Sequence, residues 1–157
     1  MTQEQTPATT LPEGYTFRAL EASDYANDYL ETLKVLTTVG DISESSFIKL
    51  IQHWQTYSSI YHPHVITNPQ GKVVATGMLL VELKAIHECG KVGHIEDISV
   101  ALTEQGKKLG NYMVCTLSRL AKEQGCYKVI LDCGEHNVGF YEKCGYKQAG
   151  VEMAQRF

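Results

Sequence analysis

The stretch that decides the fold covers residues 92–125 and reads VGHIEDISVALTEQGKKLGNYMVCTLSRLAKEQG. β-Branched residues crowd its first part, which predicts a strand over 92–100. Apolar residues recur at helical spacing in its last part, namely Leu109, Met113, Leu117 and Leu120. Gly125 then follows as a helix stop signal. The stretch therefore predicts a strand, a short polar turn and an amphipathic helix.

The turn between this strand and this helix contains Gly106 and Gly110. The first N–H groups of a helix have no helical carbonyl partner, and the helix dipole adds positive potential, so such a turn can hold a phosphate. Strand–turn–helix units are common, however, and two glycines are equally typical of an ordinary turn. Phosphate binding is the first hypothesis for this turn.

Two adjacent carboxylates, Glu96 and Asp97, interrupt the strand between Ile95 and Ile98. Neighbouring side chains of a regular strand point to opposite faces, so one of the two carboxylates would face the core. A β-bulge is the alternative, because it re-aims a side chain.

Composition places the chain among single-domain globular proteins. Its 157 residues are 43% hydrophobic and 20% charged, and the net charge is −4 without any run of Lys or Arg. We expect a flexible polar tail over 1–12, one domain over 13–157, and no nucleic-acid partner. No apolar stretch reaches the length of a membrane span and no signal peptide is apparent, so we expect a cytoplasmic protein with no membrane partner.

Cysteine and histidine spacing predicts neither a disulfide framework nor a metal site. The five cysteines, at 89, 115, 126, 133 and 144, include no CxxC pair. We expect reduced and mostly inert thiols, although a catalytic cysteine is the alternative. His62 and His64 flank Pro63 without a third ligand nearby, so we expect no metal there.

The remaining chain predicts a mixed sheet with helices. We expect Ser23 or Asp24 to cap the first helix and Ser43 the second, whose core stripe is Phe47, Leu50, Ile51 and Trp54. The predicted strands are 15–20, 64–67, 72–87 with a bend or bulge midway, 92–100, 126–133 parallel to its predecessor, and material within 144–157. The predicted helices are 24–36, one that follows Ser43 and includes Phe47 to Trp54, 109–124 and 137–143.

This order of elements, and QGKKLG at 105–110, resemble the GNAT acyltransferases, whose pyrophosphate loop is Q/R-x-x-G-x-G/A. The blocks LKVLTTVG, KAIHECGKVGHIEDISV, GCYKVILDC, NVGFYEKCGY and GVEM with its following Arg resemble the eukaryotic glucosamine-6-phosphate N-acetyltransferases. The resemblance implies the GNAT fold, an α/β (α+β) architecture in which helices flank both faces of a mixed, mostly antiparallel sheet. It also implies acetyl-CoA as cosubstrate and no metal.

The resemblance assigns the cofactor contacts. Backbone N–H groups near Asp97 and Ile98 would bind the thioester oxygen. The other cofactor-binding residues would be Gln105, Gly106, Lys107, Lys108, Leu109, Gly110, Asn137, Tyr141 and Lys143. Lys108 departs from the family loop, which has a glycine there, so its side chain either obstructs the phosphates or supplies a cation.

The resemblance also assigns the chemistry, with Glu96, Asp132 and Tyr141 as catalytic residues. Asp132 would hold or deprotonate the amine, while the Tyr141 hydroxyl would donate to the leaving thiolate. From the residues alone, Asp132 is equally typical of a turn cap, Tyr141 of a core aromatic, Asn137 of a helix cap and Lys143 of a solvated charge.

By the same resemblance the acceptor is D-glucosamine 6-phosphate, and the protein is a homodimer with shared active sites. The substrate-binding residues would be Thr37, Lys84, His87, Glu96, Asp97, Tyr127, Lys128, Asp132 and Arg156. Lys84 and His87, three apart in the expected strand 72–87, would need a bend between them to share a face. The alternatives are acetylation of another amine, such as a protein lysine or a polyamine, and a non-catalytic acyl-CoA-binding module.

Overall fold

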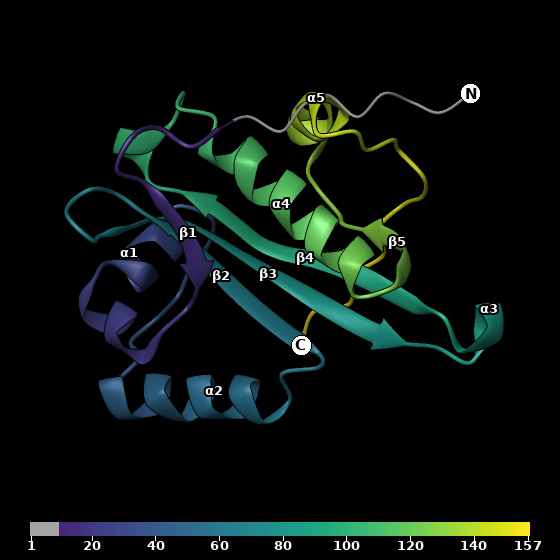
Figure 1. Ribbon diagram of the computed structural model, residues 1–157, viewed down its shortest axis with the longest axis horizontal. Coiled ribbons are helices and arrows are strands. Elements are labelled where there is room, and N and C mark those ends of the chain that lie inside the picture. The colour runs from purple at the N-terminus through teal and green to yellow at the C-terminus, as the bar shows by residue number, and fades with distance from the viewer. Residues whose placement is uncertain (1–9) are drawn as a thin grey trace.

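The computed structural model describes residues 10–157 and contains one five-stranded sheet in the order β1-β2-β3-β4-β5 (Figure 1). The strands are β1 (Thr16–Ala19), β2 (Tyr61–Thr67), β3 (Val73–Leu83), β4 (Lys91–Val100) and β5 (Cys126–Ile130). The first four pair antiparallel, and β5 pairs parallel to β4. The predicted mixed sheet is confirmed, because a crossover helix connects β4 to the parallel strand β5.

Helices cover both faces of the sheet. The α-helices are α1 (Tyr29–Leu33), α2 (Glu44–Thr56), α3 (Ile86–Cys89), α4 (Leu109–Glu123) and α5 (Val138–Lys143). The short 3₁₀ helices are η1 (Ala22–Ala26), η2 (Leu102–Glu104) and η3 (Glu135–Asn137). Figure 1 shows α4 and α5 over one face and α1 and α2 over the other. Helices thus flank both faces of the sheet, as predicted.

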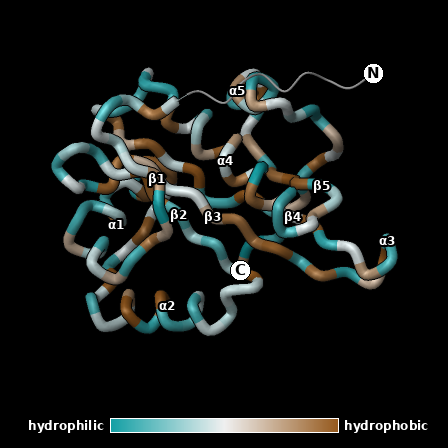
Figure 2. The backbone as a smooth tube through the Cα atoms, viewed as in Figure 1, coloured by the Kyte–Doolittle hydropathy of each residue, from teal (hydrophilic) through white to brown (hydrophobic). Residues whose placement is uncertain are grey.

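Each face has its own hydrophobic core, and the middle strands lie between the two cores (Figure 2). On the α4 face, Leu109, Met113 and Leu117 are fully buried, as their spacing predicts. Gly77 of β3 lies under this helix, where an added Cβ would come within 2.8 Å of the Leu117 and Met113 side chains. The missing side chain at Gly77 therefore lets α4 approach the sheet closely.

On the opposite face, α2 begins at the predicted cap, where Ser43 Oγ accepts the Ser46 N–H at 3.2 Å. Phe47 and Ile51 are buried as expected. Leu50 is exposed, so the prediction of four core residues was wrong at that position. The stripe is narrower because α2 lies at the edge of its core.

The predicted helix over 24–36 is wrong, because the chain breaks into η1 and α1 at Asn27 and Asp28. The Asn27 carbonyl accepts the Val73 N–H of β3 at 2.8 Å, and Asp28 has a left-handed φ of 69°. Pairing with the sheet therefore replaces helix continuation. Leu36, expected on the helical stripe, lies beyond α1 and is exposed.

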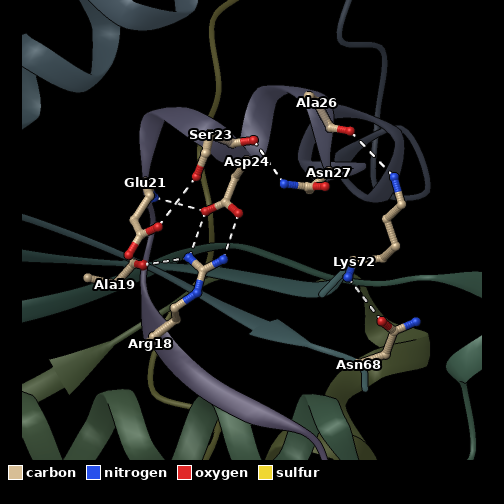
Figure 3. A network of polar contacts seen from close by, with 9 residues as sticks. All are labelled: Arg18, Ala19, Glu21, Ser23, Asp24, Ala26, Asn27, Asn68 and Lys72. Carbon is tan, nitrogen blue, oxygen red and sulfur yellow. Dashed lines mark hydrogen bonds and ion pairs between the residues drawn. The ribbon is translucent and has the colours of Figure 1, made fainter. Parts of the chain in front are cut away.

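Asp24 is not the N-cap of a helix but lies fully buried in a polar network beside β1, where it completes the capping box of η1 with Glu21 (Figure 3). Its carboxylate accepts two bonds from the Arg18 guanidinium, at 2.7 and 2.8 Å, and the Glu21 N–H at 2.9 Å. These bonds satisfy a buried charge and raise the pKa of Arg18. The network fastens η1 to the first strand.

Three predicted segments end elsewhere in the structure. β2 begins at Tyr61 rather than at residue 64, and β3 ends at Leu83, so Lys84 and His87 lie in the connection to β4 rather than in a strand. Residues 144–157 form no strand within the described chain, because no sheet edge pairs with them and Val151 and Met153 stay 86% and 89% exposed.

Residues 1–9 of the expected tail lie outside the described residues, whereas Leu11 already packs against the core. Among residues 10–157, none of the helices combines the length and apolar character needed to cross a bilayer. The same residues contain no group of three His, Cys, Asp or Glu side chains placed to hold a metal ion.

Candidate active site

A cavity of about 1440 Å³ lies between the end of β4, the start of α4 and the short helix α5. β4 contributes Ile98, Ser99 and Val100 to its wall. The side of α5 contributes Asn137, Phe140, Tyr141 and Lys143. Figure 1 shows α4 and α5 over the same face of the sheet, which places these walls together. The stretch 92–125 thus forms most of the cavity's floor and one wall.

A β-bulge lies at the β4 end of this cavity. Thr76 of β3 pairs with Ser99 and Met78 pairs with Glu96, so Gly77 alone faces both Asp97 and Ile98. Asp97 has a left-handed φ of 55°, and its carbonyl accepts the Thr76 hydroxyl at 2.9 Å. Of the two alternatives for the adjacent carboxylates, the structure has the bulge, which removes the Asp97 and Ile98 backbone from the regular ladder.

The predicted phosphate loop lines the cavity with Gln105, Gly106, Lys108, Leu109 and Gly110. Because α4 begins at Leu109, the N–H groups of its first turn lie on this wall and have no helical carbonyl partner. This arrangement favours an anionic phosphate at the mouth of the loop.

Lys108, where the family loop has a glycine, adopts a left-handed φ of 61° at the N-cap of α4. The position therefore requires a backbone conformation that glycine adopts without strain and lysine does not. Gly110 meets a different demand, because an added Cβ would lie 3.2 Å from the Phe140 ring. Position 108 thus requires a left-handed backbone conformation, whereas the missing side chain at Gly110 lets α5 pack against α4.

The Lys107 side chain does not line the cavity. Its ammonium group lies 2.6 Å from the Glu104 carboxylate and 3.0 Å from the Tyr15 hydroxyl, which itself donates to Glu104 at 2.6 Å. Lys107 thus ties the loop to the segment before β1, and any contact with a cofactor would come from its backbone.

Four cations and one carboxylate line the cavity, namely Lys108, Arg119, Lys122, Lys143 and Glu104. This balance suits a polyanionic ligand such as coenzyme A. Sequence reasoning missed Arg119 and Lys122. The available signal was a polar stripe on α4 opposite its core stripe, in which Asn111, Cys115, Arg119 and Lys122 follow each other at helical spacing.

Carboxylates gather around the bulge. Burial raises the pKa of Glu96, and the charges of Asp132 and Asp97 raise it further. Burial also raises the pKa of Asp97. The structure therefore brings together the three carboxylates that the sequence analysis selected, although Asp132 lies just beyond β5 rather than within it. The charge of Glu152 in the C-terminal segment also raises the pKa of Glu96; the sequence analysis did not select this residue, although it lies in the block GVEM that carries the resemblance.

Tyr141 lies between these carboxylates and the cavity. Burial raises its pKa to about 12, with smaller contributions from Cys133, Cys144, Asp132 and Glu96. Its ring makes edge-to-face contacts with Phe140 at 4.9 Å and with Tyr146 at 6.3 Å. The hydroxyl therefore stays protonated at neutral pH and can donate a hydrogen bond into the cavity.

The residues expected to bind a sugar phosphate lie away from the cavity. The Lys84 ammonium is 3.2 Å from a Glu82 carboxylate oxygen, and the His87 ring packs at a tilt against Tyr127, with 4.2 Å between the ring centroids. Lys128 Nζ lies 5.9 Å from the centre of the same tyrosine ring. Thr37 and Arg156 are exposed and lie outside the cavity wall. Within one described chain, these residues and the carboxylates do not form a closed site.

Comparison with known proteins agrees with this geometry. The model of the acetyltransferase (GNAT) family matches residues 26–146. A glucosamine 6-phosphate N-acetyltransferase of Candida albicans is 69% identical over 94% of this chain and 99% of its own length. The crystal structure of the Arabidopsis thaliana glucosamine-6-phosphate N-acetyltransferase superposes with a TM-score of 0.90 at 38% identity, covering 92% of this chain and 99% of that one. The chain belongs to the GNAT acetyltransferase family.

Proposed function

We propose that the chain transfers the acetyl group of acetyl-CoA to the amine of D-glucosamine 6-phosphate, giving N-acetyl-D-glucosamine 6-phosphate and CoA. The main support for this proposal is that the bulge, the carboxylates and Tyr141 meet at one end of a cation-lined cavity. Relatives at 69% and 38% identity are both named glucosamine 6-phosphate N-acetyltransferase, which supports the choice of acceptor. The proposed place of the reaction is UDP-N-acetylglucosamine biosynthesis in the cytoplasm.

The residues divide the work of a direct transfer in a ternary complex. Asp132 and Glu96 form an anionic surface that attracts the ammonium form of the acceptor, and Asp132 accepts a proton as the amine attacks. The backbone N–H groups of Asp97 and Ile98 donate to the thioester oxygen, on which negative charge develops. The protonated Tyr141 hydroxyl donates to the departing sulfur.

A sugar phosphate also needs cations, and we propose that a second copy of the chain supplies part of them. The single chain keeps Lys84, His87, Tyr127, Lys128 and Arg156 outside the cavity. Exposed apolar side chains on β5 and the C-terminal segment, including Tyr127, Ile130, Val151 and Met153, offer a surface for such a homodimer.

The test is acetyl-CoA consumption with a panel of acceptors at equal concentration. The panel contains glucosamine 6-phosphate, glucosamine, a polyamine and a basic peptide. Glucosamine 6-phosphate should be used far more efficiently than glucosamine, because the phosphate supplies binding energy that positions the amine. Faster use of the polyamine or peptide would indicate an acetyltransferase that acts on another amine. Binding of acetyl-CoA without turnover on any acceptor would indicate a non-catalytic acyl-CoA-binding module.

A further inference from the structure

Two thiols meet on the wall of the cofactor cavity. Cys115 lies on α4, Cys144 directly follows α5, and both line the cavity beside Asn111. The Asn111 amide donates to Cys144 Sγ at 3.3 Å and its oxygen accepts from Cys115 Sγ at 3.9 Å. The five cysteines are all unbridged. The sequence analysis expected inert thiols, and nothing in the spacing of 115 and 144 indicated that both would contact Asn111.

The two thiols differ in pKa. A hydrogen bond from Cys144 lowers the pKa of Cys115 to about 7, and the same bond raises the pKa of Cys144. Burial raises the pKa of Cys126, which lies outside the cavity. Since the thiolate is the reactive form, Cys115 is the better nucleophile of the two at neutral pH.

We propose that Cys115 and Cys144 form a reversible disulfide, with glutathione disulfide or a similar small disulfide as oxidant, and that this bond weakens acetyl-CoA binding. The second part rests on the proposed cofactor cavity. The first part stands on the position of both thiols against the side chain of Asn111.

The reaction proceeds by two exchanges. The Cys115 thiolate attacks one sulfur of glutathione disulfide, which forms a mixed disulfide and releases one glutathione thiolate. Cys144, having lost its proton to solvent or to that thiolate, then attacks Cys115 Sγ and releases the second glutathione. The protein pair is oxidised by two electrons, one glutathione disulfide is reduced to two glutathione molecules, and the two thiol protons pass to them.

The bond would act on the cavity through α5. A covalent link brings the two sulfurs closer than a hydrogen bond does and ends the thiol contacts of Asn111. It also fixes the end of α5, which carries Tyr141 and Lys143, against α4. If acetyl-CoA binds the reduced protein more tightly than the disulfide-bonded protein, bound acetyl-CoA must shift the thiol–disulfide equilibrium toward the reduced pair by the same factor.

The first experiment incubates the purified protein in glutathione buffers of increasing oxidising power and maps disulfides by peptide mass spectrometry. We expect a Cys115–Cys144 bond in the wild type and in Cys126→Ser, reversed by dithiothreitol. In Cys144→Ser, Cys115 should instead accumulate as its glutathione mixed disulfide. A wild type that stays reduced, that stops at mixed disulfides, or that bridges other cysteines first would overturn the proposal.

The second experiment measures acetyl-CoA affinity of the reduced and bridged proteins by calorimetry after glutathione is removed. We expect about tenfold weaker binding by the bridged form, a typical coupling between two sites. Equal affinities would refute the regulatory part and leave the disulfide standing. Failure of the reduced protein to bind acetyl-CoA would instead refute the proposed function, so the two failures are distinguishable.

Discussion

Single side chains at the bulged end of the cavity have separate tasks although they lie close together. Asp132 and Glu96 both carry carboxylates, and Glu96 feels the charge of Asp132. In the proposed reaction, only Asp132 takes up a proton, whereas both carboxylates attract the acceptor. Substitutions that keep side-chain size and remove charge separate these tasks.

Replacing Asp132 by Asn should lower turnover by about 10²- to 10⁴-fold, the usual contribution of a general base. Acetyl-CoA affinity should stay unchanged, because Asp132 lies outside the cofactor wall. Steady-state kinetics and calorimetry check both values. Glu135→Gln, in the exposed turn that follows, serves as the matched control. Normal turnover of a folded Asp132→Asn protein would remove Asp132 from the role of base.

Glu96→Gln should stabilise the fold at neutral pH. The pKa of Glu96 is raised in the folded state. The folded protein therefore loses stability as the pH rises from the unfolded-state pKa of Glu96 through its folded-state pKa. The glutamine variant avoids this loss, so its melting temperature should exceed that of the wild type at pH 7 and match it below the unfolded-state pKa, at about pH 4. The exposed Glu13→Gln should show no such difference. An equal effect at both pH values would contradict the electrostatic cause.

Secondary-structure elements contribute irregularities rather than regular geometry to the site. The bulge of β4 and the first turn of α4 both contain a non-glycine residue with positive φ, at Asp97 and Lys108. Such conformations persist because neighbouring elements hold them. At Asp97, the hydrogen bond from the Thr76 hydroxyl to the Asp97 carbonyl holds the conformation.

Thr76→Val should disrupt the bulge while keeping the side-chain shape. It leaves the Asp97 carbonyl without its hydroxyl partner, which costs about 1–3 kcal/mol of unfolding free energy. Turnover should fall more than acetyl-CoA affinity, because the displaced backbone carries the proposed thioester contacts. Denaturant unfolding and kinetics measure both effects. Thr76→Ser keeps the hydroxyl and should recover most of the lost turnover; failure to do so would indicate a packing role alone.

Lys108→Gly should raise stability by about 0.5–1 kcal/mol, because glycine adopts the left-handed N-cap without strain. Acetyl-CoA affinity should fall modestly, and the loss should shrink at high salt if the lysine charge is responsible. Lys108→Ala separates the two causes, since it removes the charge and keeps the strain. A large gain in affinity for the glycine variant would show that the lysine obstructs the cavity.

At the scale of the whole molecule, carboxylates and cofactor cations meet within one chain, whereas the phosphate-binding candidates do not. The C-terminal segment is exposed and unpaired, yet its Glu152 influences Glu96. Arg156 lies four residues further along the same segment. A second chain is therefore the proposed source of the missing cations.

Mixing two inactive variants tests this assembly. Lys128→Ala and Arg156→Ala should each weaken use of glucosamine 6-phosphate and leave acetyl-CoA binding intact. If the two residues enter one site from different chains, each mixed dimer regains one complete site, and the mixture should be more active than either variant at the same total concentration. Subunit exchange is verified by native mass spectrometry. No recovery after verified exchange would contradict the shared site.

Sequence patterns determined the elements whose signals are local. The run 92–125 specified β4, the turn and α4, because β-branched crowding and helical spacing act over neighbouring residues. The same patterns missed the break at Asn27 and the end of β3 at Leu83. Pairing of Asn27 with Val73 is a long-range contact that overrides local helix propensity. The expected closing strand over 144–157 lacked a partner edge, which no local pattern reveals.

The site shows the same division. Sequence and family resemblance selected Glu96, Asp132 and Tyr141, and the adjacent charges of Glu96 and Asp97 left a bulge as one of two alternatives. Only the tertiary structure decided that Lys107 turns to Glu104, that Arg119 and Lys122 face the cavity, and that Cys115 and Cys144 both contact Asn111. The physical reason is that spacing along the chain fixes the face of an element, whereas contacts between elements depend on how α4 and α5 pack over the sheet.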